Sequence, residues 1–169
     1  MQDKELVFLD TEFSSLDPYE GEVLSIGLVK PNGEEFYTEL QYGGPANDWV
    51  KNNILPTLKN QIPREEAKQK VWDFIGDSNP LPVGFICQFD IVYLHKLFGW
   101  EDKDVPFGFP PIDFSSILMG KGYDPIEYLD HQAKFAKKLD INYKDITRHN
   151  ALDDAKFMKR VWEKVINDS

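Results

Sequence analysis

The sequence predicts an α/β domain in which a central five-stranded mixed sheet is flanked by helices. Three apolar segments near the N-terminus are separated by turn residues, which indicates an antiparallel meander because consecutive strands usually pair. Shorter apolar segments then alternate with helical patterns, as they do in βα units. The chain has 169 residues, of which 41% are hydrophobic, so it can bury a core. We expect residues 1–169 to form one domain.

Each expected strand is an apolar or β-branched segment bounded by turn residues. Between the second and third strands, Pro31-Asn32-Gly33 supplies a turn, since Gly33 tolerates a positive φ angle. A proline bounds the fourth strand, and Pro110-Pro111 precedes the fifth. The strands are expected at residues 6–13, 22–29, 35–40, 81–87 and 112–114.

The helices are expected where apolar residues recur at a spacing of about 3.6. Asp48 is a candidate cap for the first helix, and Pro63 suits the first residue of the second. Gly99 follows the third helix as a stop signal. The helices are expected at about residues 48–55, 63–78, 89–98, 125–139 and 150–166, and Asn79-Pro80 ends the second of them.

The formal net charge of −10 argues against broad, sequence-independent binding of duplex nucleic acid. An enzyme that acts on nucleic acid remains compatible with this charge, because bound divalent cations would make an acidic site locally positive. Cys87 is the single cysteine, which excludes an intramolecular disulfide and fits a reducing cytoplasm. No apolar run approaches the ~20 residues that span a bilayer. Residues 1–5 do not resemble the start of a signal peptide, so we expect a cytoplasmic protein without a membrane segment.

Two acidic residues in the first expected strand carry the strongest functional signal. Asp10 and Glu12 stand two positions apart, so a strand would direct both carboxylates to one face. Two buried like charges repel each other and lose hydration, and a hard divalent cation with oxygen ligands would compensate for this. The alternative is a strand end that reaches solvent with two ordinary surface acids, and this stretch alone favours neither interpretation.

Three further polar residues lie near the starts of expected helices. Asp90 lies where a buried strand gives way to a helix, which is where α/β sheets bind ligands, although an acid there often only complements the helix dipole. Asp154 shares a helix face with apolar residues and so needs a partner, whereas Asp153 fits a capping position. His149 precedes this helix, where it could accept a proton from water or be an ordinary surface residue.

Together these segments resemble the DEDDh 3'-5' exonucleases, a family named for four acids and a histidine. The matching residues are Asp10-x-Glu12, Asp90 at a strand-to-helix junction, and His149-x-Ala151-x-x-Asp154-Ala155. Within this family, the chain is similar to the small ribonuclease AS-like exoribonucleases at residues 8–13, 24–29, 35–40 and 49–56. The resemblance covers the whole chain and implies a ribonuclease H-like fold.

The resemblance implies a role for each signature residue. The metal ligands that it implies are Asp10, Glu12, Asp90 and Asp154. They would hold two divalent cations, Mg²⁺ or Mn²⁺, which can stabilise both the attacking and the leaving oxygen of a phosphodiester. His149 would be the general base. Thr11 and Phe13 would meet the terminal nucleotide, and Phe13 could either stack a base or belong to the core.

The resemblance further implies that the protein releases nucleoside 5'-monophosphates from the 3' ends of single-stranded RNA or of 3' overhangs, as a homodimer. A DNA 3'-5' exonuclease of the proofreading or repair type is the alternative within the class. A module that binds nucleic acid or a partner without catalysis is the alternative from another class. The presence of all five signature residues argues against such a module.

Overall fold

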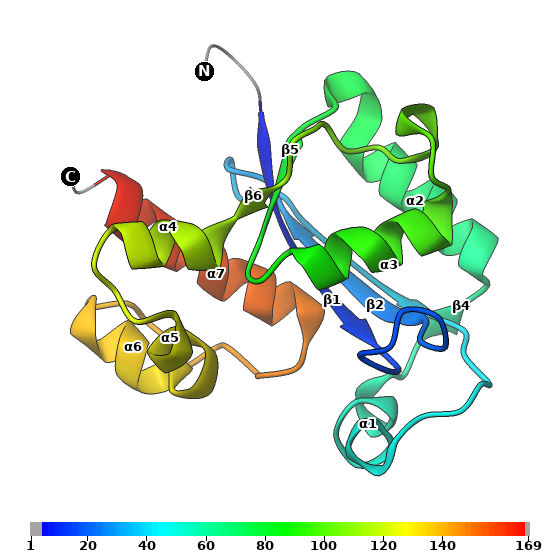
Figure 1. The fold of residues 1–169 in the computed structure, drawn as a ribbon, viewed down its shortest axis with the longest axis horizontal. Helices are drawn as coiled ribbons and strands as arrows, with labels where there is room; N and C mark the ends of the chain where they lie inside the picture. Colours follow the sequence, from blue (N-terminus) through cyan, green and yellow to red (C-terminus); the bar gives the residue numbers. More distant parts are fainter. Residues whose placement is uncertain (1–4, 168–169) are drawn as a thin grey trace.

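The structure is a computed structural model that describes residues 5–167; residues 1–4, part of the segment inspected for a signal peptide, lie outside it. A six-stranded sheet forms its centre, in the order β4-β3-β2-β1-β5-β6 (Figure 1). Strands β1, β2 and β3 form an antiparallel meander, whereas β4, β5 and β6 pair parallel to their neighbours. The strands are β1 Leu6–Phe13, β2 Val23–Val29, β3 Glu35–Leu40, β4 Gln61–Ile62, β5 Leu81–Gly84 and β6 Ile112–Asp113.

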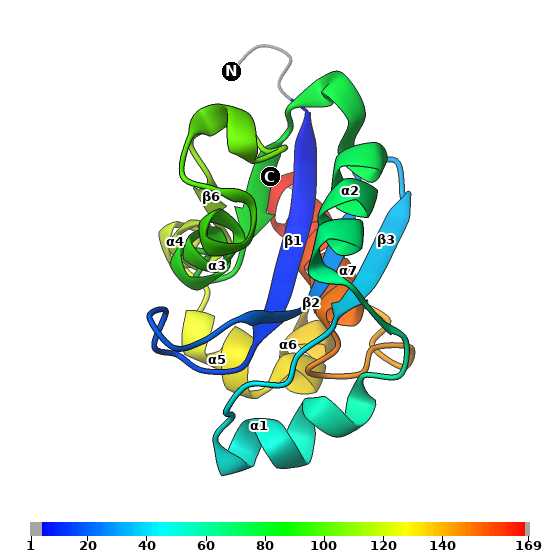
Figure 2. The same ribbon diagram turned by 90° about the vertical axis from the view of Figure 1, so that its right-hand side faces the viewer.

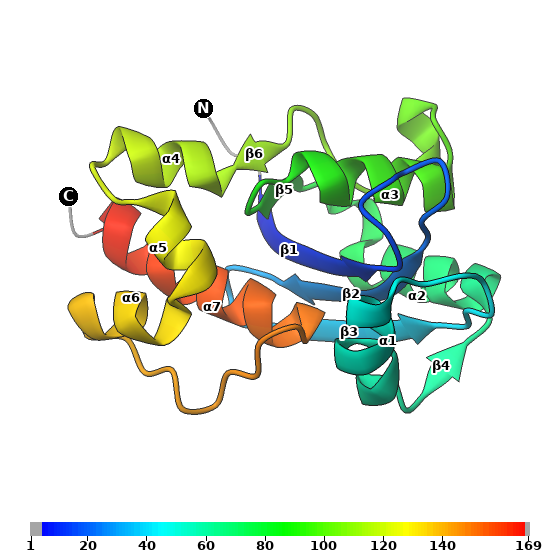
Figure 3. The ribbon, with the colours of Figure 1, turned by 60° about the horizontal axis from the view of Figure 1, so that its bottom comes forward.

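Helices cover both faces of the sheet. One face packs against α2 and α3, and the other packs against α4, α5, α6 and α7 (Figures 1 and 2). Helix α1 packs against the start of β2 through Val50 and Leu24 (Figure 3). The α-helices of the described residues are α1 Asp48–Asn53, α2 Arg64–Ile75, α3 Gln88–Phe98, α4 Phe114–Gly120, α5 Pro125–Asp130, α6 Gln132–Lys138 and α7 Ala151–Asn167. Short 3-10 helices lie at Leu55–Thr57, Gly76–Ser78 and Asp102–Asp104.

The alternation of side chains along β1 decides which residues reach which layer. Val7 and Leu9 are buried in the core shared with α2 and α3, whereas Phe8 is buried in the core shared with α7. Because side chains alternate along a strand, Asp10 and Glu12 continue the face of Phe8. The end of β1 therefore directs its two carboxylates toward α7.

Gly27 allows α7 to approach the sheet at this point. It pairs with Asp10 across β1 and β2. A Cβ atom at Gly27 would lie 2.2 Å from the carbonyl carbon of Ala151, the first residue of α7, so only glycine fits. This close contact brings the first turn of α7 beside the acidic end of β1.

The predicted mixed sheet with flanking helices is confirmed, but the sheet has six strands rather than five. The additional strand, β4, has two residues and is too short to show alternation in the sequence. The helix expected at 125–139 is two helices, because His131 has non-helical backbone angles between α5 and α6. Helix α4 was not expected; the Asp113 side chain caps it by accepting a hydrogen bond from the Ser116 amide.

Two expected element ends are also wrong. Strand β5 stops at Gly84 rather than at residue 87, since Ile86 has a φ angle of 54° and turns the chain into α3. Asn47, not Asp48, caps α1, because its side chain accepts a hydrogen bond from the Val50 amide. Among the described residues, no helix combines the length and the apolarity needed to cross a membrane.

Candidate active site

Three acids meet where the end of β1 faces the start of α7. Asp10 and Glu12 come from β1, and Asp154 comes from the first turn of α7. One carboxylate oxygen from each acid lies within 4.8 Å of the others. The side chains are half-buried, so the cluster has an open side. The sequence prediction that these acids share one site is therefore consistent with their placement.

Asp90 reaches the same site from the first turn of α3. Its Oδ1 atom accepts hydrogen bonds from the Thr11 amide at 2.9 Å and from the Thr11 hydroxyl at 2.6 Å. Thr11 lies between Asp10 and Glu12 and points to the opposite face of β1. Asp90 is 5% exposed. It is therefore fixed to the strand that carries the other acids, and Thr11 is the residue that fixes it.

All five signature residues line one cavity of about 340 Å³. Thr11 and Phe13, predicted to meet a nucleotide, also line it, together with Leu16, Phe85, Phe89, Tyr128, Gln132 and Arg148. One face of the Phe13 ring is already stacked on Tyr93, at a centroid distance of 4.6 Å. The cavity thus combines acidic with apolar and aromatic side chains, which suits a phosphate held through bound cations beside a stacked base.

Burial is the largest cause that raises the pKa of each acid in the cavity. The pKa of Asp10 is well above its usual value, and that of Glu12 is about 8, because the negative charges of Asp154 and Asp90 add to burial. Burial also raises the pKa of Asp90 to about 7 and that of Asp154 to about 6, despite the hydrogen bonds that each accepts. A bound cation would remove this penalty and keep the acids ionised.

The donor atoms fit a hard divalent cation. All four candidate ligands are carboxylates, which suit Mg²⁺ or Mn²⁺ better than zinc. Cys87 is buried, and its thiol has a pKa raised to about 11, chiefly by burial, so it remains protonated at neutral pH. Asp10, Glu12 and Asp154 are close together, and Asp90 lines the same cavity. All four acids carry raised pKa values, and a cation would stabilise this arrangement.

Asp154 is held by two residues besides its own helix. The Gln132 side-chain amide donates to Oδ1 at 3.1 Å, and the His149 main-chain amide donates to Oδ2 at 2.9 Å. The Tyr143 hydroxyl in turn donates to the Gln132 carbonyl oxygen at 2.7 Å. Sequence reasoning missed Gln132 and Tyr143. The signal in the sequence is weak, since a glutamine in a polar helix is normally exposed.

His149 stands at the rim with a constrained backbone. Its φ angle is 61°, in the left-handed region that residues other than glycine seldom adopt. Its ring meets the Trp49 ring edge-on, at a centroid distance of 5.0 Å. Burial lowers the pKa of the imidazole, and the charge of Arg148 lowers it further, so the ring is neutral near pH 7. Asp153 instead accepts a hydrogen bond from the Thr147 amide, as expected for a helix-start acid.

A mixed sheet flanked by helices, with an acid-lined cavity at one end of β1, is the arrangement expected of a metal-dependent nuclease domain. The chain belongs to the Rv2179c-like 3'-5' exoribonuclease domain family, whose model matches residues 5–166. This confirms the resemblance seen in the sequence. No curated protein sequence matches the chain significantly.

Solved structures share the fold at low sequence identity. A full-length 3'-exonuclease has a TM-score of 0.69 and 12% identity, covering 98% of this chain and 82% of its own. Escherichia coli exonuclease I in complex with a dA16 oligonucleotide has a TM-score of 0.70 and 11% identity. Exonuclease I from Methylocaldum szegediense has a TM-score of 0.61 and 14% identity. The matches cover 98% of this chain in both cases but only 41% of each exonuclease I chain, so the chain spans less than half of those proteins.

Proposed function

We propose that the protein is a two-metal DEDDh exoribonuclease that removes nucleoside 5'-monophosphates from the 3' ends of single-stranded RNA. The observation that carries the proposal is the meeting of Asp10, Glu12, Asp90, His149 and Asp154 in one cavity, although they are distributed over the chain. The four acids would hold Mg²⁺ or Mn²⁺. When bound, two such ions supply positive charge beside the attacking and the leaving oxygen.

His149 is proposed to act as the general base. A ring nitrogen of the neutral imidazole accepts a proton from the attacking water and passes it to solvent. The main-chain hydrogen bond to Asp154 and the edge contact with Trp49 hold the histidine at the rim. The apolar walls of the cavity, including Phe85 and Phe89, would exclude water around the terminal nucleotide and let a base stack.

The family supports RNA as the substrate. Among the similar structures, exonuclease I was solved with a deoxyoligonucleotide, which supports DNA as a second candidate. A panel of matched ribo- and deoxy-oligonucleotides with one sequence tests the choice, and faster hydrolysis of the ribo-oligonucleotide is expected. Equal or faster hydrolysis of the DNA would move the proposal to a DNA 3'-5' exonuclease.

Metal dependence is tested by chelation. EDTA should abolish hydrolysis, and Mg²⁺ or Mn²⁺ should restore it, because the four carboxylates that line the cavity would repel the substrate phosphate unless a cation is bound to them. The zinc-bound form of E. coli exonuclease I, which shares this fold, supports cation binding here. Asp10→Asn, which keeps the shape of the side chain but removes its charge, is the matched inactive control. Full activity after exhaustive chelation would contradict the two-metal proposal.

We also propose that the chain is one domain, that it acts as a homodimer and that it works in the cytoplasm. The shared sheet and the cores on its two faces support a single domain. The buried free thiol of Cys87 supports a reducing compartment. The homodimer rests on the family resemblance, and sedimentation equilibrium of the purified protein tests it.

A further inference from the structure

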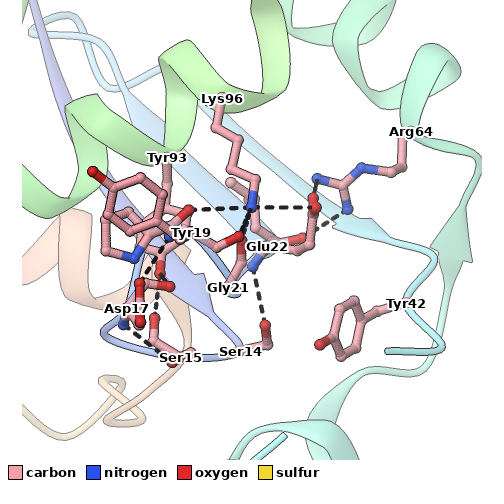
Figure 4. Close-up of polar contacts among 12 residues, drawn as sticks. Ser14, Ser15, Asp17, Tyr19, Gly21, Glu22, Tyr42, Arg64, Tyr93 and Lys96 are labelled. Atoms are coloured by element: carbon pink, nitrogen blue, oxygen red, sulfur yellow. Dashed lines mark hydrogen bonds and ion pairs between the residues drawn. The ribbon is translucent and has the colours of Figure 1, made fainter. Parts of the chain in front are cut away.

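Residues 14–22, which connect β1 to β2, form a compact loop beside the cavity. Its ends are closed by two hydrogen bonds, from the Ser14 amide to the Glu22 carbonyl at 3.0 Å and from the Glu22 amide to the Ser14 hydroxyl at 3.0 Å. Inside the loop, the Gly21 amide donates to the Asp17 carbonyl at 2.7 Å. The loop, shown in Figure 4, therefore has a defined shape rather than an extended path.

Helix α3 holds this loop from one side. The Lys96 ammonium donates to the carbonyl of Gly21 at 2.6 Å and to that of Pro18 at 3.1 Å, and it lies 3.6 Å from a Glu22 carboxylate oxygen (Figure 4). The Tyr93 hydroxyl donates to the carbonyls of Ser15 and Asp17. Arg64 pairs with the other Glu22 carboxylate oxygen at 2.7 Å, so Glu22 keeps a positive partner without Lys96. The carbonyl oxygens of Pro18 and Gly21 would instead lose their charged donor, which is unfavourable.

The loop and the helix also fit closely. A Cβ atom at Gly21 would lie 2.2 Å from the Tyr93 hydroxyl oxygen. The loop therefore contacts α3 at a glycine, where a larger residue would not fit. Tyr93 is 1% exposed and stacks on Phe13, which follows Glu12 in β1. The contact between loop and helix is therefore packed as well as hydrogen-bonded.

The same helix positions an acid of the candidate active site. Asp90, Tyr93 and Lys96 are spaced three residues apart, so they share one side of α3. Asp90 is bonded to Thr11 in β1, and Tyr93 and Lys96 are bonded to the loop that follows β1. The loop contributes Leu16 to the cavity, and this side chain is 67% exposed. Helix α3 thus fixes the loop relative to the acids.

We propose that Lys96 is a positioning residue for substrate: it anchors loop 14–22 as a preformed wall of the nucleic-acid cleft. The inference rests on the proposed exonuclease function. An anchored loop meets the oligonucleotide without first being ordered, so it lowers the cost of binding and leaves the chemistry at the acids unchanged. Loss of the anchor should therefore raise KM rather than lower kcat.

The test replaces Lys96 and compares two readouts. Lys96→Met keeps the length of the side chain and removes the ammonium. Lys70→Met is the matched control, because within residues 5–167 Lys70 makes an exposed ion pair with Glu66 of its own helix and no other ion pair. In Lys96→Met, KM for a short single-stranded RNA should rise about tenfold, as expected for losing hydrogen bonds from a charged donor, with kcat nearly unchanged. Amide hydrogens of residues 14–22 should exchange faster in the same variant.

A second variant keeps the test decisive. Tyr93→Phe removes the hydroxyl that bonds the loop but keeps the ring that stacks on Phe13. It should also raise KM and speed exchange in the loop. If the amide hydrogens of residues 14–22 exchanged as slowly in Lys96→Met as in the wild type, Lys96 would not anchor the loop. If they exchanged faster but KM stayed at the wild-type value, the loop would not be a wall of the substrate cleft. If the wild type hydrolyses no oligonucleotide, the proposed function fails, while exchange still decides whether Lys96 anchors the loop.

Discussion

The hydrogen bond from Gln132 to Asp154 allows a quantitative prediction about metal binding. Gln132→Met removes the donor that lies 3.1 Å from Asp154 Oδ1 and keeps an unbranched side chain of similar length. This donor lowers the pKa of Asp154, so its loss should raise that pKa further above about 6. A hydrogen bond to a charged group contributes about 1.5–3 kcal/mol. Removing such a group from behind a metal ligand typically costs 10–100-fold in affinity, and we expect a loss of roughly this size.

Isothermal titration calorimetry with Mn²⁺ at pH 7 measures this effect. Tyr143→Phe is the graded control, because it removes the hydroxyl that orients the Gln132 amide but leaves the amide present. Its loss of affinity should be smaller than that of Gln132→Met. The affinity of Gln132→Met should recover partly at higher pH, where Asp154 is ionised in both proteins. A Gln132→Met protein that binds Mn²⁺ as tightly as the wild type at pH 7 would refute the reasoning.

Three further predictions concern stability and catalysis. In the metal-free protein, folding raises the pKa of Glu12 from 4.5 to about 8, so the folded state binds more protons than the unfolded state between these values. The melting temperature of the metal-free protein should therefore fall as pH rises through this window. Mg²⁺ should restore the melting temperature, and Glu12→Gln should weaken its dependence on pH. His149→Ala should lower kcat about 10²–10⁴-fold and keep the affinity for Mn²⁺. If this variant turned over as fast as the wild type at every pH tested, His149 would not be the general base. Gly27→Ala should destabilise the protein by ~1–3 kcal/mol in denaturant unfolding, because its methyl group meets the Ala151 backbone.

The sequence predicted the parts of the fold that local pattern determines. Alternation along β1 placed Asp10 and Glu12 on one face, and that placement follows from strand geometry alone. The start of α7 was also predictable, since Asn150 caps it by accepting a hydrogen bond from the Asp153 amide. Family resemblance then supplied the grouping of the acids, which spacing by itself left open.

Features that depend on tertiary contact were not predictable. The break between α5 and α6 occurs at His131 without glycine or proline, so no local signal marks it. Gln132 is 7% exposed because that break turns it toward Asp154. Lys96 binds carbonyls that lie 75 and 78 residues away in the chain. A lysine in a helix and a glutamine in a helix are ordinary in sequence, and only their partners give them a role.

We propose that this cavity is the metal-dependent active site of a 3'-5' exoribonuclease. The most direct measurement follows a single-stranded RNA with a 5' label over time, with Mg²⁺, using the wild type and Asp10→Asn. The wild type should give a ladder that descends by single nucleotides from full length, and the variant should leave the RNA intact. An internal cut, immediate release of a labelled mononucleotide, or the same ladder with Asp10→Asn would contradict the proposal.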